Sequence, residues 1–324
     1  MGKSMFTRRQ FGLMGISLLA GGAVRAQEGY PHSPVKIVVP YSAGGASDIV
    51  ARLIAANLMS SLGQPVVDEN RPGANGIVAA TLVSKAAPDG YTLMVVSSGH
   101  STNSAINDSV PFDPVKDFTM ITQVGKVSMV VVVDPGAGID SVASLVAKAK
   151  AAPGAIKYGS GGIGASNHLA VELFASTVGV QFTHVPYKGD APAIQDLLGG
   201  RIDFMFLGPP SAQPLADAGK VVPIAVTDER RLPLMPDVPT VTEAYAPFTA
   251  GSWHAVIAPA GLPGPVLERL NREIVAIVRR PEVTAKLAEL GIQAIGSEPA
   301  VLQALMTSEV RKWKEMVRTG KIKL

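Results

Sequence analysis

Short apolar runs alternate with helical patterns along most of this chain. Val35–Pro40 is apolar and rich in β-branched side chains, which is typical of a buried strand. A turn-rich segment follows, and Gly63 ends the next pattern. Within that pattern, apolar side chains recur at helical spacing and predict one buried helix face, at Ile49, Leu53, Ile54 and Leu58.

The same order of strand, loop and helix recurs. Further strands are predicted at Tyr91–Val96, Val127–Val133, Ala155–Tyr158, Val180–Pro186, Ile202–Leu207, Val222–Thr227 and Ser252–Ala258. Further helices are predicted at Ser141–Ala151, Asn167–Thr177, Ala191–Leu198, Pro265–Arg279, Glu282–Leu290 and Pro299–Val317. This alternation predicts an α/β protein with mainly parallel sheets and helices on both faces. The long strands at Val127–Val133 and Ser252–Ala258 are candidates for crossings between two domains.

The N-terminus reads as an export signal. A basic head with Lys3, Arg8 and Arg9 precedes the apolar stretch Phe11–Ala23, and Val24–Ala26 forms a small-residue cleavage site. The stretch is shorter than the ~20 residues that span a bilayer. The adjacent arginines also resemble a twin-arginine signal, so both export routes stay open. Residues 1–26 are therefore predicted to be a cleaved signal peptide, and the mature protein to work in the periplasm.

Removing the signal changes the charge of the protein. The whole chain has 29 Lys and Arg against 26 Asp and Glu, and the signal takes four basic residues, which leaves 25 against 26. This balance argues against a nucleic-acid partner, because such proteins carry clustered positive charge. The chain has no cysteine, which excludes disulfides, thiolate metal sites and cysteine nucleophiles.

Three glycine-rich loops follow predicted strands, where ligands bind in open α/β sheets. The loops combine glycines with hydroxyl side chains and cover residues 41–48, 97–101 and 159–168. Two of them run into a helix N-terminus, which attracts anions through unpaired N–H groups and a partial positive charge. The alternative is local capping of the helices by Ser47, Asp48, Ser166 and Asn167. Three such loops in one chain favour a shared anion site.

The sequence gives little support for dinucleotide binding, for a hydrolase nucleophile or for a metal site. Gly159, Gly161 and Gly164 match G-x-G-x-x-G, but the next strand lacks the acidic residue that a dinucleotide site needs. No G-x-S-x-G or H-E-x-x-H motif occurs, so neither an α/β-hydrolase nucleophile nor a zinc site is indicated. His100 and His168 lie in the loops and could donate to a bound anion. Neither a metal nor a cofactor is expected.

Several segments along nearly the whole mature chain match a known family. They include VKIVVPYSAGGASDIVARLIA from Val35, VVDENRPGANGIVAA from Val66, GSGGIGASNHLAVELF from Gly159 and VPYKGDAPAIQDLLGGRIDFMF from Val185. KAAPDGYTL from Lys85, PDVPTVTEA from Pro236 and Trp253–Pro263 add to the match. Through these segments the chain resembles the Bug-type solute-binding receptors of tripartite tricarboxylate transporters.

The resemblance implies a type II periplasmic binding protein, a two-domain Venus-flytrap fold with a ligand cleft between the domains. The implied domains are residues 27–127 plus 252–324, and residues 128–251. The implied function is capture of a small organic acid (a mono-, di- or tricarboxylate, aromatic acids included) for the membrane permease subunits of a tripartite transporter, by a monomer. A ligand-sensing receptor that feeds a membrane signalling partner is an alternative, and a secreted enzyme acting on an organic acid is another.

The family's ligand contacts carry over onto the matching positions of this chain. The first domain should supply Tyr41, Ser42, Gly44, Gly45, Asp48 and Ser98. The second should supply Gly161, Gly164, Ser166, Asn167, His168, Tyr187, Lys188, Gly189 and Asp203. His100 is added from its place in the second loop.

Overall fold

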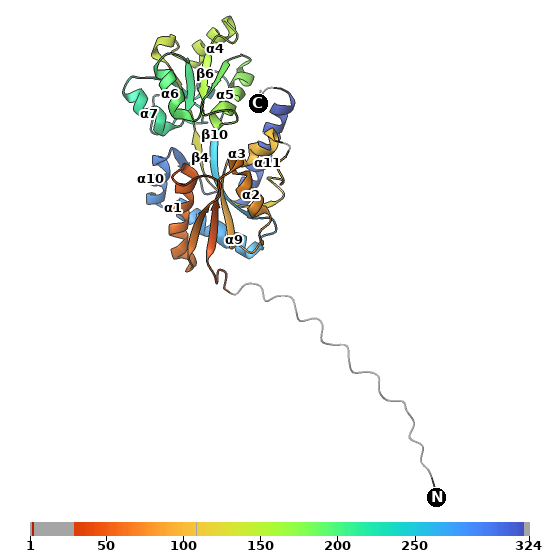
Figure 1. Ribbon diagram of the computed structural model, residues 1–324. Coiled ribbons are helices and arrows are strands. Elements are labelled where there is room, and N and C mark those ends of the chain that lie inside the picture. Colours follow the sequence, from red (N-terminus) through yellow and green to blue (C-terminus); the bar gives the residue numbers. More distant parts are fainter. Residues whose placement is uncertain (1, 3–28, 108, 321–324) are drawn as a thin grey trace.

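The computed structural model describes residue 2, residues 29–107 and residues 109–320 (Figure 1). The predicted signal peptide lies outside these residues apart from Gly2. The described part folds into two α/β units, each built around its own sheet, stacked one above the other in Figure 1.

The first sheet has the strand order β11-β4-β10-β3-β1-β2. Its strands are β1 (Val35–Val39), β2 (Val66–Asn70), β3 (Thr92–Ser97), β4 (Phe118–Ser128), β10 (Gly251–Pro259) and β11 (Ile292–Ala294). Neighbouring side chains of β1 point to opposite faces of this sheet. Ile37 and Val39 belong to the core on one face, and Val38 belongs to the core on the other.

Helices cover both faces of the first sheet. One face packs against α1 (Ala46–Leu62), α9 (Gly264–Val278) and α10 (Pro281–Glu289). The other packs against α2 (Ile77–Ser84) and α11 (Pro299–Arg318), and the short α3 (Gly99–Ile106) packs on α11. Val50, Ile54 and Leu58 bury one side of α1 as its helical spacing requires, but Ile49, expected on that side, is exposed.

The second sheet has the order β7-β6-β8-β5-β9. Its strands are β5 (Val130–Val133), β6 (Lys157–Ser160), β7 (Thr183–Pro186), β8 (Phe204–Leu207) and β9 (Val222–Val226). One face packs against α4 (Val142–Ala151), α5 (Ser166–Val178) and α8 (Val241–Ala244), and the other against α6 (Asp190–Leu198) and α7 (Pro209–Asp217). Single 3₁₀ turns lie at Ala74–Gly76 and Pro135–Ala137.

Both sheets are mixed, so the prediction of mainly parallel sheets is wrong. β10 is antiparallel to β3 and β4, and β5 is antiparallel to β8 and β9. These are the strands through which the chain passes between the two sheets. β10 brings the chain back from the second unit into the middle of the first sheet, where it runs against its neighbours.

The expected long strand Val127–Val133 is in fact two strands. β4 ends at Ser128 in the first sheet and β5 begins at Val130 in the second, so one β-branched run serves both sheets. The chain returns to the first unit between Val226 and Gly251. No described helix combines the length and apolar character that crossing a bilayer would require.

Candidate functional site

A cleft of about 400 Å³ lies between the two sheets. Loops at the ends of β1 and β3 line it from the first unit, and the N-terminal half of α5 lines it from the second. The crossing strands β4 and β10 line it between them, and α11 adds a further wall. This volume suits a small molecule.

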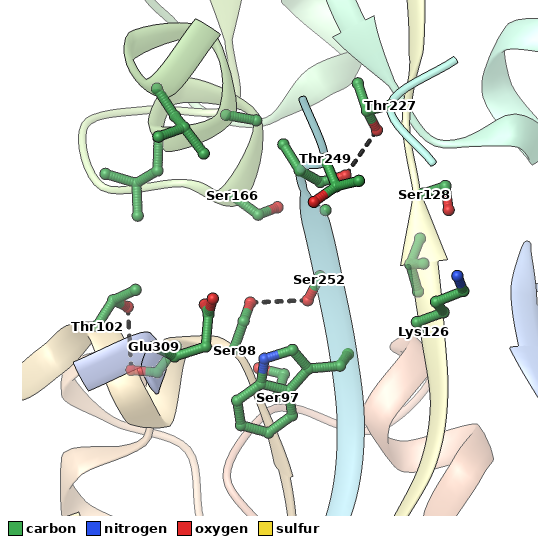
Figure 2. A pocket seen from close by; sticks show the side chains of 18 of the residues that line it. Ser97, Ser98, Thr102, Lys126, Ser128, Ser166, Thr227, Thr249, Ser252 and Glu309 are labelled. Atoms are coloured by element: carbon green, nitrogen blue, oxygen red, sulfur yellow. Dashed lines mark hydrogen bonds between the residues drawn. The ribbon is translucent and has the colours of Figure 1, made fainter. Parts of the chain in front are cut away.

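Hydroxyl groups dominate the polar part of the lining (Figure 2). They come from Ser97, Ser98, Thr102, Ser128, Ser166, Thr227, Thr249 and Ser252. Ser98 Oγ and Ser252 Oγ are 2.8 Å apart, which joins the second glycine-rich loop to the crossing strand β10. Hydroxyl groups can donate to an anion without carrying charge themselves.

Tyr41 lines the cleft, and hydrogen bonds to neighbouring polar side chains hold its hydroxyl in place. Its hydroxyl lies 3.0 Å from Ser97 Oγ and 3.4 Å from Asn75 Oδ1. Asn75 is held in turn by Asn103, with Nδ2 donating to Asn103 Oδ1 at 3.0 Å. A Cβ at Gly99 would lie 3.0 Å from the Tyr41 hydroxyl, so this close approach favours glycine.

Two helix N-termini open onto the cleft from opposite units. α3 begins after Ser98 and α5 begins after Ala165, and neither of these N-cap residues caps its helix with its side chain. Ser98, Gly99, Ala165 and Ser166 all line the cleft. First-turn N–H groups and the positive ends of two helix dipoles therefore face one space, which favours an anion there.

Two ion pairs line opposite sides of the cleft. Lys126 Nζ lies 2.8 Å from Asp228 Oδ1, and Ser128 Oγ donates to Asp228 Oδ2 at 2.5 Å. Burial alone would raise the pKa of Asp228, but the hydrogen bonds from Lys126 and Ser128 outweigh it and hold the pKa below its ordinary value. On α11, Lys312 pairs with Glu309. Each lysine is thus already bound to an acid of this chain.

Trp253 lines the cleft and also carries a buried donor without a partner among the described residues. Its side chain is 4% exposed, and its indole N–H has no hydrogen-bond partner within the part of the chain that the structure describes. Buried polar groups nearly always have a partner in native proteins.

The structure brings four of the predicted contact residues together. Tyr41, Ser98, Gly164 and Ser166 line the cleft, from both units. Ser42, Gly44 and Gly45 of the first loop are exposed and are not part of the lining. Ser166 is the first residue of α5 rather than its cap, and its side chain is exposed to the cleft.

Asp48 is buried and tied to its own unit. Its carboxylate accepts from Arg52 Nε at 2.9 Å, from Gly44 N at 2.9 Å and from Asn70 Nδ2 at 2.9 Å. The hydrogen bond from Arg52, with those from Gly44 and Asn70, lowers the pKa of Asp48 to about 2 despite its burial. In this geometry Asp48 holds the first loop on α1.

Asn167 and His168 shape the third loop from behind the cleft. Asn167 Oδ1 accepts from Gly161 N at 3.2 Å, and its Nδ2 donates to Asp190 at 2.9 Å. Gly164 N donates to His168 Nδ1 at 3.1 Å, which fixes the turn that lines the cleft. His168 also stacks on His184, with ring centroids 4.1 Å apart.

The remaining predicted residues, apart from Lys188, have partners within their own units. His100 is buried between Phe112 and Phe118, and its Nε2 lies 3.3 Å from Pro114 O. Gly189 N donates to Gly161 O at 3.1 Å. Lys188 is exposed.

Tyr187 and Asp203 also lie off the cleft lining. Tyr187 donates to Asp196 at 2.7 Å, and Asp203 accepts from Lys157 N at 2.6 Å. The ligand role of these residues, as of the four on the lining, stays a prediction.

Sequence reasoning missed the contribution of α11. Leu305, Glu309, Lys312 and Trp313 line the cleft although they lie far from any glycine-rich loop. Spacing along α11 indicates which residues share a face, but the sequence does not say that this face reaches the cleft. Among the described residues, no cluster of His, Cys, Asp or Glu is arranged to hold a metal ion.

Comparison with known proteins identifies the family. The profile of the tripartite tricarboxylate transporter family receptor, TctC, matches residues 50–322. This chain belongs to that receptor family. Protein BugT of Bordetella pertussis is 33% identical over 321 residues, which cover 98% of each chain.

Solved TctC-type relatives share the fold. A structure of an R. palustris protein with adipate is 36% identical with a TM-score of 0.74, and the match covers 90% of this chain and 98% of that one. MatC from Rhodopseudomonas palustris, solved with bound malate, is 32% identical with a TM-score of 0.72 over 89% of this chain and 100% of its own. These matches confirm the predicted α/β periplasmic binding fold. The TctC family consists of solute-binding receptors rather than enzymes, and relatives of this chain are periplasmic binding proteins.

Proposed function

We propose that this receptor captures a small organic carboxylate in the cleft, closes around it and delivers it to the permease subunits of a tripartite transporter. The observation that carries the proposal is the pair of α3 and α5 N-termini facing one hydroxyl-lined space. A carboxylate between them would accept from N–H and O–H donors of both units. Relatives solved with adipate and malate support a carboxylate ligand.

The two sheets with their helices are the proposed closing bodies, residues 27–127 plus 252–324 and residues 128–251. Because the chain crosses between the sheets at few points, a hinge there would let the α5 loop approach the α3 loop. The ligand carboxylate would then be the group that both bodies contact. Export through the N-terminal signal would place this receptor in the periplasm, where it would meet its permease.

A stability screen tests the carboxylate ligand. We expect the melting temperature of the mature chain, residues 27–324, to rise with some of a panel of mono-, di-, tri- and aromatic carboxylates. A ligand at 100 times its dissociation constant adds about 2.7 kcal/mol to the free energy of unfolding. The corresponding neutral amides serve as controls and should produce no shift. A folded, ligand-free preparation that no carboxylate stabilises would contradict the proposal.

Ser166 tests the placement of the carboxylate. We expect Ser166→Ala to weaken carboxylate binding about tenfold or more, because one hydrogen bond to a charged group is lost. The melting temperature of the ligand-free protein should stay unchanged, because the Ser166 side chain is exposed and does not cap α5. Ser60→Ala, on the exposed surface of α1 away from the cleft, is the matched control. Unchanged affinity in Ser166→Ala would remove this residue from the site.

A further inference from the structure

The two sides of the cleft differ in chemistry. In Figure 2, Thr102 and Glu309 lie on one side and Lys126 and Ser128 on the other, with Ser98 between them. The side with Lys126 is polar and carries the Lys126–Asp228 pair. The side with Glu309 joins the N-terminal half of α5 to the C-terminal half of α11.

An apolar wall occupies the junction of these two helices. We use this name for Leu169 and Leu173 of α5 together with Leu305 and Trp313 of α11, all of which line the cleft. Trp313 and Leu169 are 6% and 3% exposed and share one small core with Met316 and Ala105. The apolar wall is therefore built from both units and continues directly from the hydroxyl-lined space.

An acid that pairs with a lysine of its own helix borders the apolar wall. Glu309 is 14% exposed and accepts from Trp313 Nε1 at 2.9 Å, which fixes both side chains. Lys312 pairs with Glu309, and its ammonium lies 4.7 Å from the centre of the Trp313 ring. The positive charge here is thus already bound to an acid and an aromatic face.

We propose, on the basis of the function proposed above, that the ligand is an amphipathic monocarboxylate whose apolar tail lies against the apolar wall. The carboxylate head lies between the N-termini of α3 and α5, and the tail removes Leu and Trp surface from water. Glu309 is the specificity-determining residue. A second carboxylate at the far end of the tail would be desolvated against the apolar wall, and Glu309 already pairs with Lys312, the neighbouring lysine that could otherwise compensate its charge.

Matched pairs of acids test this preference in the wild-type protein. Isothermal titration calorimetry with hexanoate and octanoate, against adipate and suberate, varies only the far end of a chain of equal length. We expect each monocarboxylate to bind about tenfold or more tightly than its dicarboxylate partner. Within the monocarboxylates, affinity should rise about fourfold per added methylene until the space is filled. Hexanamide keeps the tail but lacks the charged head, and it should not bind.

Glu309→Gln tests the source of the preference. Glutamine keeps an oxygen for the Trp313 indole but removes the charge and frees Lys312 to meet a second carboxylate. We expect adipate to gain about fivefold in affinity and hexanoate to change by less than about twofold. Glu229→Gln removes the same charge at the exposed rim of the cleft and should have a much smaller effect. The melting temperature of each ligand-free variant checks that it folds.

The outcomes separate this inference from the function on which it rests. The inference is supported if monocarboxylates bind more tightly than their dicarboxylate partners and Glu309→Gln reduces this difference in affinity. Equal or tighter binding of adipate and suberate in the wild type overturns it and leaves a carboxylate receptor whose ligand extends toward Lys126. Failure of every carboxylate to bind overturns the proposed function and this inference with it. Equal effects of Glu309→Gln and Glu229→Gln overturn the role of Glu309.

Discussion

Mild acid should destabilise this protein well above the pH at which carboxylates titrate. Three histidines are buried, His100, His168 and His254, with exposed fractions of 5%, 1% and 5%. Burial lowers the pKa of each from 6.5 to about 4, and His184 beside His168 adds to the effect there. Between the pKa of the unfolded state and that of the folded state, the histidines bind protons in the unfolded chain but not in the folded chain. Stability is therefore fully present above pH 6.5 and is lost as the pH falls toward 4.

The loss should amount to at most about 3 kcal/mol per histidine, since one pKa unit corresponds to about 1.4 kcal/mol. Urea unfolding between about pH 7 and pH 5 measures it as a falling transition midpoint. Asp48 cannot produce this loss: its pKa is lowered from 3.8 to about 2, so the stability it contributes is lost only below that ordinary value.

His100→Gln, which cannot titrate, should flatten the pH dependence by about one proton. His32→Gln, the same substitution at an exposed position, is the matched control. A transition midpoint that stays constant from pH 7 to pH 5 would contradict the expected result.

The sequence predicted the strand and helix units well where each element lies in one sheet. The strand at β1 and the helices α5, α9 and α11 were placed within about two residues, because their apolar spacing reflects local burial. The split between β4 and β5 was missed, because nothing in the local pattern marks Met129 as the change of sheet. β2 was missed because Asp68 and Glu69 interrupt its apolar pattern, and the strand lies at the edge of its sheet.

The candidate site also contains residues that the sequence indicates and residues that only the fold brings to the cleft. Glycines and hydroxyls next to a strand end can be recognised locally, and Ser98, Gly164 and Ser166 do line the cleft. The sequence does not reveal which loop residues turn inward, and the hydrogen bonds of Asp48 and Asn167 explain why these two hold loops instead. Glu309 and Trp313 reach the cleft only because α11 packs across the first unit onto α5. That packing is a property of the whole fold.

Asp228 should be among the most sensitive positions at the crossing between the sheets. Asp228 comes shortly after β9 of the second sheet, and its carboxylate binds Lys126 and Ser128 on β4 of the first sheet. Thr227 next to it makes two backbone hydrogen bonds at the same junction. Its N–H donates to Met129 O at 2.8 Å, and its backbone O accepts from Ala250 N at 3.0 Å. These bonds connect the outgoing and returning segments of the chain where a closing motion would pivot.

We expect Asp228→Ala to lower the free energy of unfolding by about 3 kcal/mol, the low end for a broken buried pair. The loss stays at the low end because the Lys126 side chain is 34% exposed whereas Asp228 is 6% exposed. Water can therefore hydrate the lysine ammonium when its partner is removed. A double-mutant cycle in urea isolates the interaction, and adding Lys126→Met should restore about 1 kcal/mol or more of the loss. Glu289→Ala breaks the exposed pair with Lys286, whose side chains are 62% and 63% exposed, and should cost less than about 1 kcal/mol. Strictly additive effects of Asp228→Ala and Lys126→Met would mean that the stability at this crossing comes from the backbone bonds around Thr227 and not from the ion pair.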